Sequence, residues 1–210
     1  MAGIVSIVIL FLIIGQSGEP SYAVGYLILG GLTYGADLFV IWLLIFKRRN
    51  ATWADIGFRP VKPWILLVML PLTLPLLVLT GILAELTVRL FGEVPGPADQ
   101  LGVPSAGLSV TDFVVSFLVV VVIGPVVEEI VFRGILYQVL RARKGIAFGL
   151  IISSLTFAII HFIPILLAVF LVMGIAFALV TELTKSIYPA ILLHALNNGV
   201  SIVLVYLAVN

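Results

Sequence analysis

The sequence contains no cysteine and very little charge. Only 10% of its 210 residues are Asp, Glu, Lys or Arg, whereas a soluble domain carries about 25%. Without cysteine the chain has no disulfide, no thiol nucleophile and no cysteine metal ligand. The formal net charge is +1, and the basic residues stand in short clusters at the ends of apolar runs. Nothing in this pattern favours nucleic-acid binding.

The sequence is instead rich in long apolar stretches. Hydrophobic residues make up 62% of the chain, and a membrane helix needs about 20 predominantly apolar residues. The sequence therefore predicts an all-α, polytopic membrane helix bundle with about seven transmembrane helices, and a single membrane-embedded domain over residues 1–210. The predicted spans are residues 2–14, 22–46, 64–91, 113–143, 146–162, 165–180 and 187–209.

The distribution of charge predicts an orientation in the membrane. Basic residues follow apolar runs at 47–49, 141–144 and 185, whereas the loop 92–112 has three acidic residues and no Lys or Arg. Lys and Arg concentrate in cytoplasmic loops, so we expect a multi-pass protein of the cell membrane, surrounded by lipid, with a cytoplasmic N-terminus. Residues 50–63 are too polar and too rich in proline to cross hydrocarbon, and predict a cytoplasmic connector.

Few ionisable residues fall inside the predicted spans away from their ends, and three of these stand close together in one helix. A charge at the centre of a bilayer costs about 2.5–3.5 kcal/mol, so such residues usually face the bundle interior and mark function. Glu129 and Arg133 are four positions apart and can pair on one helix face, which leaves Glu128 free to do chemistry. The alternative is a buried network of the three that only fixes helix packing.

The two histidines of the chain, His161 and His194, also lie in apolar surroundings. A lone membrane histidine is often only a hydrogen-bond partner between helices, but two of them beside an unexplained pair of acids favour a shared site. Asn198 follows His194 by four residues and shares its helix face. Water-mediated amide hydrolysis would use Glu128 as base, His161 to share the proton, and His194 with Asn198 as oxyanion donors.

A metal site is the alternative use of the same residues. One carboxylate and two histidines form a known catalytic zinc ligand set, which here would be Glu128, His161 and His194. No His-Glu-x-x-His motif is present to support zinc by spacing. We therefore prefer a site without metal, with zinc as the alternative.

Three motifs occur in order within the region 113–209. They are Glu128-Glu129-x-x-x-Arg133 followed by Gly134, Phe157-x-x-x-His161, and His194-x-x-x-Asn198. Together they resemble the CAAX protease and bacteriocin-processing family of intramembrane proteases, which includes the type II CAAX prenyl endopeptidase. Residues 55–60 are similar to the connector that precedes the motif helices in that family.

The resemblance implies roles that agree with those argued from the residues. The first glutamate and the first histidine of the family activate water, and the second histidine and its asparagine form an oxyanion hole. These positions correspond to Glu128, His161, His194 and Asn198, with Glu129 and Arg133 in support. Family members have been described both as metalloproteases and as glutamate-dependent proteases, so the metal question stays open. The implied substrate is a prenylated CAAX protein or a membrane-associated peptide.

Two other functions remain as alternatives. Glu128, Glu129 and the histidines can also form the proton relay of a coupled transporter or channel, although no inverted repeat supports it. A membrane scaffold or immunity protein without catalysis is the second alternative, because intact motifs do not prove turnover. We expect an intramembrane endopeptidase.

Overall fold

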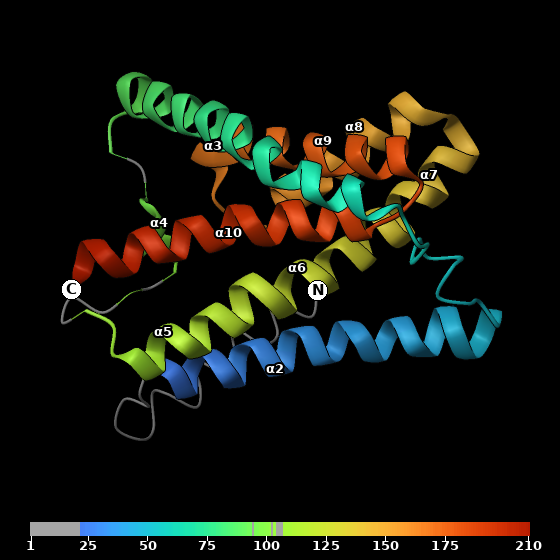
Figure 1. Cartoon of the computed structure of the whole chain (residues 1–210), viewed down its shortest axis with the longest axis horizontal. Coiled ribbons are helices and arrows are strands. Elements are labelled where there is room, and N and C mark those ends of the chain that lie inside the picture. Colours follow the sequence, from blue (N-terminus) through green and yellow to red (C-terminus); the bar gives the residue numbers. More distant parts are fainter. Residues whose placement is uncertain (1–21, 94, 102, 104–106) are drawn as a thin grey trace. The chain divides into compact units, whose positions relative to one another are not determined.

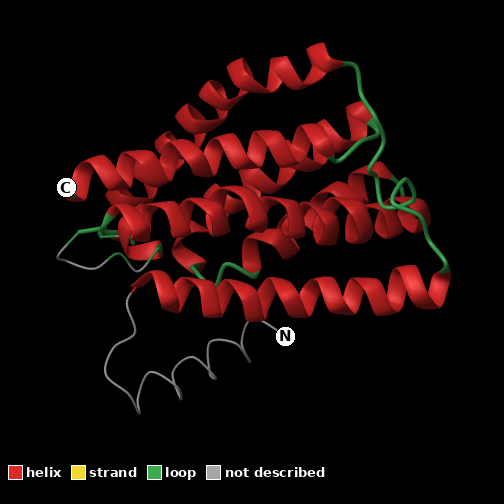
Figure 2. Ribbon diagram, turned by 60° about the horizontal axis from the view of Figure 1, so that its bottom comes forward, coloured by secondary structure: helices red, strands yellow, loops and turns green. Residues whose placement is uncertain are grey.

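The computed structural model describes residues 22–93, 95–101, 103 and 107–210. Within this part of the chain all regular structure is helical, without a strand (Figure 2). Five helical stretches are long and apolar enough to cross a membrane, and Ile146–Ile159 is a shorter apolar helix. The chain is therefore an integral membrane protein with an all-α bundle, as predicted. The predicted first span, residues 2–14, lies outside the described residues. The five stretches are Tyr22–Lys47, Pro63–Phe91, Val110–Lys144, Pro164–Thr184 and Tyr188–Val209.

The chain divides into two compact units, and each is described by itself. One comprises the described parts of Met1–Ala51, Gly96–Val127 and Asn198–Asn210, and the other Thr52–Pro95 and Glu128–Asn197. Two of the divisions fall within helices, directly before Glu128 and directly after Asn197. The assignment of all 210 residues to a single domain stays a prediction.

The first unit is built on two helices that lie side by side. Helix α2 (Tyr22–Ile41) continues into the π-helical segment η1 (Trp42–Lys47), and packs on α5 (Val110–Phe117) and η2 (Leu118–Ile123) (Figure 1). Ser109 caps α5, because its hydroxyl accepts from the Asp112 amide at 3.1 Å. The Asp112 carboxylate also accepts from the Ala23 amide at 3.0 Å. This carboxylate therefore ties the start of α5 to the start of α2.

The second unit contains four packed helices and the start of a fifth. Helix α8 (Ile146–Ile159) packs on α7 (Tyr137–Lys144) and on α9 (Leu167–Thr184), and α3 (Pro63–Phe91) packs on α9 (Figure 1). Small residues allow the close approach of α8 and α9, since a Cβ at Gly174 would lie 3.0 Å from Ser154 Cα. The remaining elements are α6 (Gly124–Glu129), which the unit boundary divides, η3 (Ile130–Leu136), η4 (Pro164–Leu166) and α10 (Tyr188–Val209).

Helix α8 ends three residues earlier than predicted, at Ile159 instead of residue 162. The helical conformation is disfavoured at a residue that precedes proline, and Pro164 begins the next element. The chain turns between them, with Phe162 in the left-handed region at φ 55°. His161 consequently lies in a turn, whereas the sequence predicted it inside the helix.

The polar connector before α3 is part of the second unit and packs there through its backbone. The carbonyl of Gly57 accepts from the Ile187 amide at 2.9 Å, and the Ser186 hydroxyl donates to the Arg59 carbonyl at 2.6 Å. The Asp55 carboxylate accepts from the amide and the hydroxyl of Thr52, which holds the pKa of Asp55 below its ordinary value. These bonds attach the connector to the start of α10.

Candidate active site

Glu129 lies at the centre of the ionisable cluster. Its side chain is fully buried, its Oε1 accepts from Arg133 Nη1 at 2.9 Å, and the same oxygen lies 3.0 Å from His194 Nδ1. The ion pair with Arg133 is the one that the spacing predicted. The bond to His194 was not predicted, because residue spacing within one helix carries no information about a neighbouring helix. Glu129 therefore joins the first motif to the third.

Arg133 is enclosed by aromatic rings as well as by its carboxylate. Its Nη2 donates to the Gly174 carbonyl of α9 at 2.9 Å. Its guanidinium carbon lies 4.6 Å from the ring centre of Phe157 and 5.2 Å from that of Phe177. A fully buried cation needs a counter-ion and favourable partners on its other sides. Arg133 sits in η3, and π-helical segments often occur at functional sites.

Glu128 differs from its neighbour in being partly open. Its side chain is 22% exposed, whereas that of Glu129 is 0% exposed. Glu128 Oε2 stands 4.0 Å from His194 Nε2, which is beyond a direct hydrogen bond. The two adjacent glutamates thus have different environments, and Glu128 faces the second nitrogen of His194.

His161 lies close to the same cluster. Its Nδ1 is 2.7 Å from the Phe157 carbonyl, which can only accept, so Nδ1 carries the proton. The imidazole stacks on Phe170 with ring centres 4.0 Å apart. Glu128, Arg133 and His194 all lie close enough to act on it electrostatically.

Phe157, the first residue of the second motif, contacts both imidazoles. Its ring centre lies 4.7 Å from that of His161 and 5.8 Å from that of His194. The ring is completely buried. Phe157 therefore packs between the two histidines, which the early end of α8 brings to one place.

Asn198 belongs to the first unit, one turn after His194 on α10. Its Nδ2 donates to the Val120 carbonyl at 3.1 Å. The Gly124 amide donates to Val119, and Pro125 has no N–H, so neither residue offers Val120 a donor. The structure thus gives Asn198 a local hydrogen-bonding role, and its role as an oxyanion donor stays a prediction.

The geometry also bears on the zinc alternative. Among the described residues, no three His, Asp or Glu side chains converge as metal ligands. The Nδ1 atoms of His161 and His194 are hydrogen-bonded to the Phe157 carbonyl and to Glu129. Bonds of this kind at Nδ1 are also compatible with metal ligation through Nε2. The preference for a site without metal therefore stays a prediction, with zinc held by Glu128, His161 and His194 as the alternative.

Sequence reasoning missed the contribution of α9. Gly174 and Phe177 touch the site without any polar side chain that would have marked them.

Glu182 was also missed, although it is the lone carboxylate of its helix. It accepts from Tyr137 Oη and Arg141 Nε, each at 2.7 Å, and from Lys185. This network holds α7 against α9.

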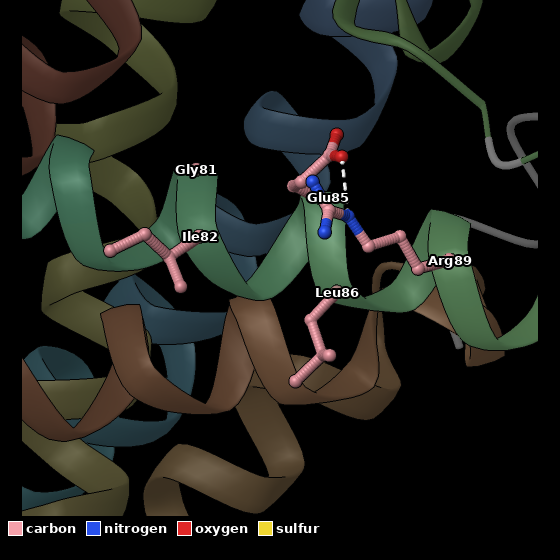
Figure 3. Close-up of a pocket in the computed structure, with 5 residues that line it drawn as sticks. All are labelled: Gly81, Ile82, Glu85, Leu86 and Arg89. Carbon is pink, nitrogen blue, oxygen red and sulfur yellow. Dashed lines mark hydrogen bonds and ion pairs between the residues drawn. The ribbon is translucent and has the colours of Figure 1, made fainter.

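A surface hollow of about 390 Å³ lies elsewhere, along α3 (Figure 3). Glu85 and Arg89 form an ion pair there at 2.8 Å, with side chains 60% and 73% exposed. Its lining comes from this one helix and includes none of the motif residues, so we do not assign the site to it. The lining residues are Gly81, Ile82, Glu85, Leu86 and Arg89.

The helices and the buried cluster together define a polytopic membrane protein with an ionisable site inside its bundle. Residues 110–200, which hold all three motifs, match the family model described as "Type II CAAX prenyl endopeptidase Rce1-like". This match confirms, for residues 110–200, the resemblance to the CAAX protease family that the motifs predicted.

Two bacterial relatives are similar to the chain. "Membrane-embedded CAAX protease MroQ" of Staphylococcus aureus (strain USA300) is 29% identical in an alignment of 175 residues that covers 76% of this chain and 66% of the relative. "Putative membrane peptidase YdiL" of Bacillus subtilis (strain 168) is 35% identical over 77 residues, 37% of this chain and 32% of the relative. The chain thus spans less than two thirds of the length of either relative. No solved structure matches the chain.

Proposed function

We propose that this protein is an intramembrane endopeptidase that hydrolyses a peptide bond with water activated by Glu128 and His161. One observation carries the proposal: Glu128 is partly open beside His194, while the adjacent Glu129 is closed into a buried ion pair. A partly exposed carboxylate beside an imidazole suits a general base. The family match over residues 110–200 supports proteolysis.

The proposed reaction needs no covalent intermediate with the protein. Glu128 takes a proton from water, whose oxygen bonds to the carbonyl carbon while the C=O electron pair moves to oxygen. His194, with Asn198 as a predicted second donor, hydrogen-bonds the resulting oxyanion. The C–N bond then breaks, and Glu128 returns its proton to the leaving nitrogen. His161, whose Nδ1 is held by Phe157, shares the proton through Nε2.

The proposed substrate is a prenylated CAAX protein or a membrane-associated peptide. The family description and the name of the relative MroQ support it. The proposed location is the cell membrane with a cytoplasmic N-terminus, where lipid-anchored substrates would meet the enzyme. Lipid surrounds the exposed apolar surface of the helices in this proposal.

The test compares purified wild type with Glu128→Gln and His194→Ala on a quenched prenylated peptide and on the same peptide without the prenyl group. Removing a general base typically costs about 10²–10⁴ in rate, so we expect Glu128→Gln to lose at least this much kcat. Glu85→Gln is the matched control, since it neutralises an exposed glutamate of an i, i+4 pair, and should keep full activity. Equal activity in all variants would refute the site.

Further measurements separate the alternatives. Loss of activity on chelation that zinc restores would favour the metal site of Glu128, His161 and His194. Glu128-dependent proton flux into liposomes, without cleavage of either peptide, would favour the transporter. Peptide binding that never leads to cleavage would favour the scaffold.

A further inference from the structure

The two ring nitrogens of His194 face different groups. Nδ1 lies 3.0 Å from Glu129 Oε1, and Nε2 lies 4.0 Å from Glu128 Oε2. The ring is held in this orientation by Phe177, which stacks on it with ring centres 4.6 Å apart and planes 19° apart. A flip of the imidazole about its Cβ–Cγ bond would put Cδ2 in the place of Nδ1 and break the bond to Glu129.

The charge of Arg133 determines which nitrogen carries a proton. Arginine stays protonated in proteins, and buried Arg133 has Glu129 as its counter-ion, so Glu129 is a carboxylate. A carboxylate can only accept hydrogen bonds. His194 Nδ1 must therefore be the donor, with its proton pointing at Glu129.

We propose that Glu129 is a positioning residue that keeps Nδ1 of His194 protonated and aims Nε2 at the space beside Glu128. Nε2 is then the nitrogen of His194 that meets the substrate. The carboxylate also lies beside the positive charge that the ring carries when His194 donates to an oxyanion through Nε2. This consequence for catalysis rests on the proposed function, whereas the protonation of Nδ1 does not.

Nitrogen-15 NMR of histidine-labelled protein in nanodiscs tests the proposal directly, because the chain contains only two histidines. His161→Gln assigns the remaining signals to His194. We expect a protonated Nδ1 in His194 of the otherwise unchanged protein. A ring protonated on Nε2 alone would overturn the proposal, and this measurement needs no variant of Glu129.

A double variant tests whether Glu129 is the cause. Glu129→Leu with Arg133→Met removes the ion pair without leaving one charge buried, and such replacements are often tolerated. We expect His194 to lose the proton from Nδ1 and to carry it on Nε2. The matched control, Glu85→Leu with Arg89→Met, removes the exposed pair of equal spacing and should leave the spectrum unchanged. An Nδ1 that stays protonated in the first variant would overturn the role of Glu129.

The kinetic readout separates this inference from the proposed function. Loss of an orienting partner typically costs about 10–100-fold, and we expect that fall in kcat for the double variant, with KM nearly unchanged. Unchanged kcat would overturn the catalytic part. If the wild type cleaves no substrate, the proposed function fails, and the NMR result still decides the protonation of His194.

Discussion

At the scale of single residues, adjacent glutamates have acquired different environments. Consecutive helical residues point about 100° apart, so Glu129 turns into the bundle towards Arg133 while Glu128 stays 22% exposed. Burying the Glu129 carboxylate without partners would cost free energy of folding. Two donors on one oxygen, from Arg133 and from His194, offset that cost.

The buried pair predicts a large difference between two similar substitutions. Arg133→Met leaves Glu129 without its counter-ion and the Gly174 carbonyl without its side-chain donor, and breaking a buried pair costs about 3–5 kcal/mol. Arg89→Met breaks an exposed pair, which should cost about 0–1 kcal/mol. Unfolding of purified protein in mixed micelles measures both free energies. Equal losses would show that the buried pair contributes no more than the exposed one.

At the scale of helices and loops, glycines set how closely the backbone segments approach. Gly134 of the first motif lies against the connector, where an added Cβ would stand 2.6 Å from the Ile56 carbonyl oxygen. Gly57, with φ at 91°, lies against Ile187 on the other side of that connector. The connector therefore packs between η3 and the start of α10 because neither glycine has a side chain.

Gly134→Ala should accordingly destabilise the protein. The new methyl would meet a backbone oxygen that cannot move aside cheaply, and overpacking costs about 1–3 kcal/mol. Gly81→Ala on α3 is the control, because nothing lies within 4 Å of its added Cβ, and it should stabilise by about 0.5–1 kcal/mol. The same unfolding measurement gives the change in the free energy of unfolding for both variants. A neutral Gly134→Ala would mean that the connector is not closely packed.

At the scale of the whole molecule, the distribution of charge predicts an orientation in the membrane. The absence of cysteine allows single cysteines to be introduced without removing any native thiol. We expect an impermeant maleimide to label Asp99→Cys from the outside and Lys144→Cys from the cytoplasm only. Both positions are exposed in the described part of the chain. Labelling of the two from the same side would refute the predicted topology.

The sequence alone determined the class of the molecule and most of its helices. Long apolar runs can satisfy their backbone hydrogen bonds in a membrane only as helices or closed barrels, and these runs are long enough for helices. The cost of charge in hydrocarbon marked Glu128, Glu129, Arg133, His161 and His194 as exceptional. The pairing of Glu129 with Arg133 was also predictable, because i, i+4 spacing is a local property.

Only the tertiary structure decided how residues of different helices meet. The bond from His194 to Glu129, the Gly174 carbonyl on Arg133 and the stacking of Phe177 all join positions far apart in the chain. Spacing within a helix predicts which residues share a face. Which face meets which neighbour depends on packing between helices, which no local pattern of residues encodes.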